Sequence, residues 1–256
     1  MSSISVILPA LNEAENLRQG LGVAVDALSG LGVAWEVVVV DDGSADDTWA
    51  VISGWHARDP RVRGIRHHQN QGYGAALRTG FRAARMDRIF FTDADLQFDL
   101  RELPLLLAHA DRYDIVAGYR RVRRDPAHRR LNAWAWGRLV DGLFDLGVRD
   151  VNCAFKVFRR EVLEDAVIRS EGAFVNTEIL ARARARGFSL IQVPVTHYPR
   201  QHGTQTGARP RVVLRAMAEL GRLYHDLRGV PVVRRAGRKQ PSTAASAEVA
   251  SPRLTG

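Results

Sequence analysis

Cysteine is almost absent from this sequence, since Cys153 is the only one among 256 residues. A single cysteine excludes an intramolecular disulfide and a zinc site built from several cysteines. Long apolar runs are missing too, and no stretch approaches the roughly 18 consecutive apolar residues that a membrane-spanning helix needs. The chain enters an apolar segment at 4–8 without a basic stretch before it, so we expect no signal peptide. These absences predict a cytoplasmic protein without a transmembrane segment.

Negative charge is also scarce, because 37 Lys and Arg outnumber 28 Asp and Glu and give a formal net charge of +9. Such an excess suits nucleic acid, an anionic membrane surface or phosphorylated ligands. Much of it lies in two segments, 120–130 and 234–239. Aromatic residues do not alternate with these basic residues, as they do in proteins that bind single-stranded nucleic acid. We therefore predict a membrane surface or phosphates as partners, and no nucleic acid.

Apolar segments typical of strands alternate with segments of helical periodicity over the first 120 residues. The expected strands are 4–8, 35–40, 62–66, 88–92 and 114–118, and the expected helices are 12–28, from 46 onward, 72–84 and 100–110. This alternation predicts an α/β fold with a mostly parallel central sheet flanked by helices. Later segments predict strands at 152–158 and 190–195 and helices at 161–167 and 176–186.

Polar side chains follow several of these strands at the point where each strand ends. They are Asn12 and Glu13, then Asp41 and Asp42, then Asp93, Asp95 and Gln97. Ligands of parallel sheets bind outside the carboxyl ends of the strands. Two carboxylates and an amide after a buried strand suit a divalent cation held near phosphates. Taken alone, an Asp-x-Asp favours a solvated acidic turn, because two nearby acids are common in loops, but three polar strand ends on one edge favour a binding site.

Two further helical segments, 128–147 and 211–227, carry apolar residues on one face and charged residues on the other. Such a face either packs on the domain core or lies in a bilayer interface. Trp134 and Trp136, with arginines before them, favour an interfacial helix for the first segment, whereas the second suits either reading. The basic segment 230–256 becomes rich in Ser, Ala and Pro, which predicts a disordered tail.

A set of short motifs occurs along the chain in a characteristic order. They are Pro9-Ala10-Leu11-Asn12-Glu13, Val40-Asp41-Asp42-Gly43-Ser44, Asn70-Gln71-Gly72-Tyr73-Gly74-Ala75-Ala76-Leu77, Asp93-Ala94-Asp95-Leu96-Gln97, Asp150-Val151-Asn152-Cys153-Ala154-Phe155-Lys156, and Val193-Pro194-Val195 with Arg200. Together they resemble glycosyltransferase family 2, and within it the dolichol- and polyprenyl-phosphate sugar synthases. The resemblance implies a GT-A fold over residues 1–207, followed by an amphipathic helix at 208–229.

The resemblance also implies roles for particular residues. The residues that would bind the nucleotide sugar are Pro9, Leu11, Glu13, Val40, Asp42, Asp93, Ala94 and Arg200. Asp95 and Gln97 would hold Mg²⁺ or Mn²⁺ on the donor diphosphate, which Arg200 would also contact. Arg120 would face the acceptor phosphate, with Arg129 or Arg130 as a looser second contact. Asp95, Arg120 and Arg200 would therefore carry catalysis.

These roles imply an inverting, metal-dependent enzyme at the inner face of the cell membrane. It would move a mannose- or glucose-type hexose from GDP-mannose or a UDP-hexose to a polyprenyl phosphate. Two departures from the family pattern stand out. Thr206 occupies the position of a common family lysine, and the transmembrane helices that many relatives carry after this domain are absent from the sequence. We therefore expect a peripheral protein, or one that works with a membrane partner.

Two other functions stay open. A transferase of the same fold could act on a hydroxyl of a lipid, saccharide or natural product, and it would need a carboxylate base. Asp150 and Glu178 are the candidates for that base. A nucleotide-sugar-binding protein without turnover is the third possibility, and the intact set of Asp93, Asp95 and Gln97 argues against it.

Overall fold

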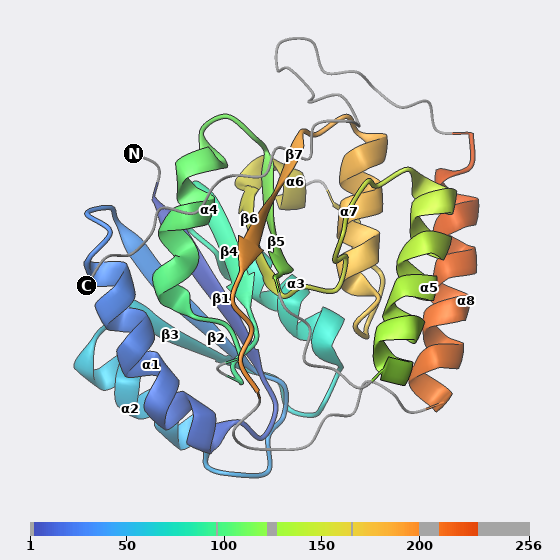
Figure 1. Ribbon diagram of the computed structural model, residues 1–256. Coiled ribbons are helices and arrows are strands. Elements are labelled where there is room, and N and C mark those ends of the chain that lie inside the picture. Colours follow the sequence, from blue (N-terminus) through green and yellow to red (C-terminus); the bar gives the residue numbers. More distant parts are fainter. Residues whose placement is uncertain (1–2, 96, 122–126, 165, 200–209, 230–256) are drawn as a thin grey trace.

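The computed structural model describes residues 3–95, 97–121, 127–164, 166–199 and 210–229 (Figure 1). Seven strands form one sheet in the order β3-β2-β1-β4-β6-β5-β7. They are β1 (Ile4–Ala10), β2 (Trp35–Asp41), β3 (Val62–Arg66), β4 (Arg88–Thr92), β5 (Ile115–Arg120), β6 (Phe155–Arg159) and β7 (Leu190–Val195). β6 is antiparallel to both of its neighbours, and the other pairs are parallel. The predicted α/β fold with a mostly parallel sheet is confirmed.

Helices cover both faces of this sheet (Figure 1). They are α1 (Ala14–Ser29), α2 (Thr48–Arg58), α3 (Tyr73–Ala83), α4 (Leu103–Ala110), α5 (Ala127–Phe144), α6 (Arg160–Glu164), α7 (Val175–Ala185) and α8 (Pro210–Leu227). The apolar side chains of α1, α2 and α4 pack on one face, and those of α3, α6 and α7 pack on the other. A short 3₁₀ turn, Leu100–Glu102, precedes α4, so the helix expected at 100–110 begins with a different geometry.

The two cores follow from the alternation of side chains along the central strands. Val6 and Leu8 of β1 point to the α1 side, whereas Ile7 between them points to the α3 side. Phe90 and Phe91 of β4 divide in the same way. Every residue of β1 and β2 is buried. Burial on both faces explains why these strands read as continuous apolar runs, as parallel strands between helix layers do.

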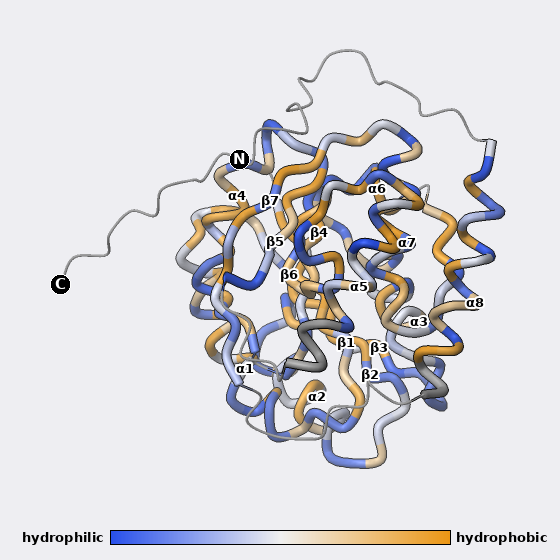
Figure 2. Tube along the Cα trace, turned by 45° about the vertical axis from the view of Figure 1, so that its right-hand side comes forward, coloured by the Kyte–Doolittle hydropathy of each residue, from blue (hydrophilic) through white to orange (hydrophobic). Residues whose placement is uncertain are grey.

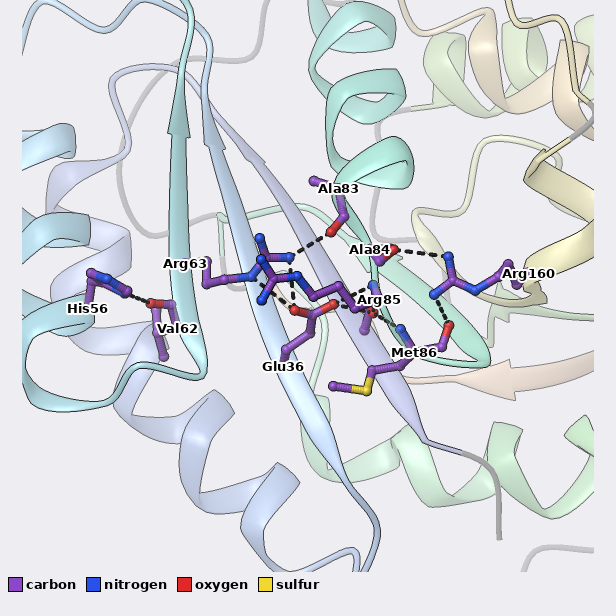
Figure 3. Close-up of polar contacts among 10 residues, drawn as sticks. Glu36, His56, Val62, Arg63, Ala83, Ala84, Arg85, Met86 and Arg160 are labelled. Atoms are coloured by element: carbon purple, nitrogen blue, oxygen red, sulfur yellow. Dashed lines mark hydrogen bonds and ion pairs between the residues drawn. The ribbon is translucent and has the colours of Figure 1, made fainter.

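A cluster of charged side chains closes the amino-terminal edge of the sheet (Figure 3). Glu36, near the start of β2, accepts hydrogen bonds from the Arg85 backbone N–H at 2.7 Å and from Arg63 Nε at 3.0 Å. Arg160 donates to two backbone carbonyls of the connection between α3 and β4. These charges are used to fix that connection, so the cluster at this edge stabilises the fold.

α5 and α8 lie side by side next to α7 and enclose a small separate core (Figure 1). Its buried members are Val140, Phe174, Ala181, Leu220 and Leu223. The ring of Trp136 packs edge-on against Phe174 with the centroids 6.0 Å apart. Part of the apolar face expected to lie in a bilayer is thus inside the protein, which corrects the interfacial reading for Trp136 and Val140. α5 also ends at Phe144, three residues before the predicted end at Gly147.

Other apolar side chains of the same helices remain exposed. Leu139 and Leu143 of α5 are 41% and 36% exposed, and Trp134 is 63% exposed. On α8 the exposed apolar residues are Val213, Leu214, Met217 and Tyr224. Figure 2 shows hydrophobic and hydrophilic residues interspersed along α8. Among the described residues no helix is both long and apolar enough to cross a membrane.

Candidate active site

The connections after β1 and β2 are joined to each other. Asn12 has φ 56°, a left-handed conformation that asparagine tolerates better than most residues. Its backbone N–H donates to Ser44 Oγ at 2.9 Å, and its Oδ1 accepts from the Ala45 N–H at 2.9 Å. Pro9 and Val40 are partners in the β1–β2 register, one residue before their strands end. The two connections that carry the residues expected to line a base and ribose pocket are therefore held side by side.

Asp42 is buried directly after β2, and its carboxylate is held by the connection between β3 and α3. It accepts from the backbone N–H groups of Gln71 at 3.0 Å and Gly72 at 2.8 Å. Its Oδ1 also lies 2.7 Å from His67 Nδ1. Gly43 beside it has φ +77°, and a Cβ there would come within 2.6 Å of Gln69 backbone atoms. Asp42 thus fixes the connection between β3 and α3, and its contact with a base or ribose stays a prediction.

The loop after β4 carries the predicted donor and metal residues. The Tyr73 hydroxyl, at the start of α3, donates to Asp93 Oδ1 at 2.8 Å. Asp95 is 5% exposed, and its Oδ1 accepts from the Gln97 backbone N–H at 3.2 Å. The Gln97 side chain donates through Nε2 to the Tyr198 carbonyl at 3.1 Å. The loop is therefore braced from both sides, by α3 and by the segment after β7.

The oxygen atoms that the side chains of this loop offer fit a hard divalent cation. Asp95 offers carboxylate oxygens, and the Nε2 bond of Gln97 leaves the amide oxygen as the atom suited to a metal. Mg²⁺ characteristically takes one or two carboxylates together with waters and substrate phosphates. Within the described residues no group of three or more His, Cys, Asp and Glu could hold a metal alone. A cation at this loop would depend on the donor diphosphate for further ligands.

Arg120, at the end of β5, forms a bidentate ion pair with Asp150. Its Nε lies 2.7 Å from Asp150 Oδ2 and its Nη2 lies 2.9 Å from Oδ1. The side chains are 17% and 4% exposed. Paired N–H···O bonds of this kind fix the plane of a guanidinium. Because both oxygens of Asp150 contact Arg120, the geometry supports a role in orienting that cation over the role of a general base.

Lys156 and Tyr73 are two polar residues whose roles the sequence does not indicate. Lys156 lies in β6, fully buried, and its Nζ donates to the Val151 carbonyl and to Asn176 Oδ1, each at 3.1 Å, and to the Cys153 carbonyl. Burial lowers the pKa of Lys156 to about 8. A lysine inside the run Phe155-Lys156-Val157-Phe158 is the signal that could have revealed it.

Glu178, the other candidate base, is likewise used by the fold. Its Oε2 accepts from the backbone N–H groups of Arg169 at 2.9 Å and Ser170 at 2.8 Å, and its Oε1 accepts from Arg182 Nε at 2.9 Å. This carboxylate holds the connection before α7, so the structure gives it a structural role.

Some predicted residues fall outside what the structure describes. Arg200 and Thr206 are outside the described residues, and so are the side chains of Arg129 and Arg130. The described candidate site therefore comprises the connections after β1 and β2, the loop at Asp93–Gln97 and the pair of Arg120 with Asp150. All of these lie at the carboxyl edge of β1, β2, β4 and β5.

A family model described as Glycosyl transferase family 2 matches residues 5–167. The chain belongs to this family. It is similar to the glycosyltransferase AglD of Haloferax volcanii, with 34% identity over 207 residues that cover 77% of this chain and 33% of that protein. The chain thus spans about a third of the length of this curated relative.

Solved structures of glucosyl-3-phosphoglycerate synthase from Mycobacterium tuberculosis share the fold. The complex with Mg²⁺ and UDP has a TM-score of 0.65 at 23% identity, covering 86% of this chain and 80% of that one. The complex with Mn²⁺, UDP and glucosyl-3-phosphoglycerate has a TM-score of 0.60 at 23% identity, covering 88% and 77%. These likenesses, together with the family match, confirm the predicted GT-A fold.

Proposed function

We propose that this protein is an inverting, metal-dependent glycosyltransferase that moves a hexose from a nucleotide diphosphate sugar to a polyprenyl phosphate. The donor would be GDP-mannose or a UDP-hexose, and the metal Mg²⁺ or Mn²⁺. The observation that carries the proposal is the meeting of the connections after β1 and β2, the Asp93–Gln97 loop and an oriented arginine at one sheet edge. Family membership and the UDP and metal complexes of the structural neighbours support the donor half.

Each residue has a distinct task in this proposal. We assign the nucleotide pocket to Pro9, Leu11, Glu13, Val40 and Asp42. The diphosphate and sugar would lie against Asp93 and Ala94. Asp95 and Gln97 would hold the cation, which supplies positive charge to the departing diphosphate. Arg200 would contact the same diphosphate.

The acceptor half rests on Arg120. A phosphate acceptor is already ionised near neutral pH, so it needs orientation against a negatively charged donor more than it needs a base. Arg120 would supply that orientation, with Arg130 as a second contact, and Asp150 holds its guanidinium in place. The partnership of both oxygens of Asp150 with Arg120 favours this acceptor over a hydroxyl, which would need a carboxylate base.

The test is a screen of radiolabelled GDP-mannose, UDP-glucose and UDP-N-acetylglucosamine against a polyprenyl phosphate, scoring label that partitions into organic solvent. We expect transfer from one donor, dependent on added Mg²⁺ or Mn²⁺. Asp95→Ala should abolish it, whereas Asp26→Ala, an exposed acid of α1, should retain it. Label transferred only to water-soluble acceptors would favour a hydroxyl acceptor, and donor binding without any transfer would favour a binding protein.

We also propose that the protein works at the inner face of the cell membrane as a peripheral protein. The exposed leucines Leu139 and Leu143 of α5 and the apolar residues of α8 would insert at the bilayer surface. Deleting α5 would remove Val140 from the core beside α7, so point variants are the cleaner test. The double variant Leu139→Ser and Leu143→Ser should lower co-sedimentation with phosphatidylglycerol vesicles roughly tenfold. Leu105→Ser, an exposed leucine of α4, is the control, and equal binding by all three proteins would exclude the role of α5.

A further inference from the structure

A series of polar groups leads from the partly buried Asp93 and Tyr73 to the buried Asn176 and Lys156. The Tyr73 hydroxyl donates to Asp93 Oδ1 at 2.8 Å. Loss of hydration on burial and the Asp93 carboxylate raise the pKa of Tyr73 well above 10, and a hydrogen bond with the Asn176 side chain opposes this shift. The hydroxyl therefore keeps its proton and can donate only to Asp93.

The series continues from Asn176 to Lys156. The Lys156 ammonium donates to Asn176 Oδ1 at 3.1 Å. With its oxygen facing the ammonium, the Asn176 amide presents its NH₂ group to Tyr73. Every donor in the series then points the same way, from the Lys156 cation to the Asp93 carboxylate. Aligned hydrogen bonds in a low-dielectric interior polarise and strengthen one another.

Lys156 also reaches the acceptor side of the site. Its other two partners are the carbonyls of Val151 and Cys153, in the turn that follows Asp150. The backbone N–H of Cys153 donates to the Asp150 carbonyl at 3.2 Å, which closes this turn. The partners of this buried ammonium are all neutral oxygens. The Lys156 ammonium therefore joins the turn that follows Asp150 to Asn176 of α7.

We propose that Lys156, Asn176 and Tyr73 are positioning residues that set the donor-side carboxylate Asp93 and the Asp150 turn carrying Arg120 in one fixed geometry. The kinetic part of this inference rests on the proposed transferase function, because it assigns Asp93 to the donor and Arg120 to the acceptor. The structural part stands without it. Neither Tyr73 nor Lys156 would touch substrate.

The first test needs no substrate and uses amide hydrogen exchange of the full chain. Tyr73→Phe removes one hydroxyl and keeps the ring, so we expect exchange of the 91–97 segment to quicken by about tenfold. Lys156→Met should quicken exchange of 149–155 as well. Tyr113→Phe is the matched control and should change the exchange of neither segment. Tyr113 precedes β5, at the end of that strand away from Arg120. Unchanged exchange at 91–97 in Tyr73→Phe overturns the inference, even if Lys156→Met fails to fold.

The second test is kinetic and uses the donor that the wild-type protein accepts. Tyr73→Phe should lower kcat/KM for the donor about tenfold and leave the acceptor KM unchanged. Lys156→Met should lower kcat/KM for both substrates. The double variant that combines Tyr73→Phe and Lys156→Met should lose little more kcat/KM than the more impaired single variant, because residues of one hydrogen-bond network are coupled. If the fold-losses in kcat/KM of the two single variants multiply in the double variant, the inference of one shared network is overturned. Altered exchange in a protein without any transfer would refute the transferase and leave the positioning network intact.

Discussion

Replacing Glu178 by glutamine separates a structural carboxylate from a catalytic base. Glu178 is 2% exposed, and it holds two backbone N–H groups of the connection before α7 and the guanidinium of Arg182. Arg182 also contacts Asp226 of α8 at 3.0 Å. Glutamine keeps one acceptor oxygen and replaces the other with an NH₂ group. Either the backbone pair or Arg182 must then face a donor instead of an acceptor.

The magnitude follows from these contacts. Hydrogen bonds to a charged group contribute about 1.5–3 kcal/mol each, and stranding a buried charge costs about 3–5 kcal/mol. Because Arg182 keeps Asp226, we expect the lower part of this range, about 3 kcal/mol of the free energy of unfolding. For a domain of roughly this size, each kcal/mol lowers Tm by about 2–4 °C. Glu178→Gln should therefore lower Tm by roughly 6–12 °C.

The assay pairs thermal unfolding with transfer activity measured well below both midpoints. Glu15→Gln is the matched control, because Glu15 forms an exposed ion pair with Arg18 on α1. Such surface pairs contribute about 0–1 kcal/mol. The folded Glu178→Gln protein should transfer sugar at close to the wild-type rate. A protein of unchanged Tm that has lost all activity would refute this reasoning and restore Glu178 as a base.

Further predictions concern the turn after β2, the buried lysine and the opposite edge of the sheet. Gly43→Ala should lower the free energy of unfolding in urea by at least about 2 kcal/mol, since its φ of +77° and the nearby Gln69 backbone disfavour a Cβ; a neutral effect would contradict the turn geometry. The pKa of Lys156 is lowered from 10.5 to about 8, so the unfolded chain binds more protons between these pH values and stability should rise with pH there. Lys156→Met should lose this pH-dependent rise in the free energy of unfolding, which is on the order of 3 kcal/mol. Urea titrations across that pH range measure it, and a rise equal to that of wild type would exclude Lys156 as its source. Glu36→Gln should cost about 2 kcal/mol of the same free energy without changing kcat/KM, and lost activity with unaltered stability would contradict its structural role.

The central strands could be read from the sequence because their pattern is strong and local. The segment 35–40 was expected as a strand, and β2 runs from Trp35 to Asp41. β6 was expected to begin at 152, but it begins at Phe155. Cys153 and Ala154, just before it, are buried like strand residues, although they belong to the turn fixed by Lys156. Burial pattern alone does not distinguish a buried turn from a strand.

The partners of the predicted site residues lay beyond sequence reasoning. Polar groups at successive strand ends predicted a common edge, and the fold brings them there. The sequence did not indicate that Asp42 would be held by Gly72, or Asp150 by Arg120, because these pairs join segments 30 residues apart. For α5 the amphipathic pattern was correct, but a pattern does not name the surface that covers it. Trp136 meets α7, whereas Leu139 stays exposed.

The reversed strand β6 acts as a spacer of fixed width. It separates β4, whose end leads to Asp93, from β5, whose end carries Arg120. Two inter-strand steps of about 4.8 Å set these ends roughly 10 Å apart, which in the proposed reaction leaves room for a sugar ring between the donor and acceptor phosphates. Because hydrogen-bonded strands cannot slide apart, the gap does not depend on loop closure. In the proposed reaction, the loops would decide which molecules enter, whereas the sheet would set the distance between donor and acceptor.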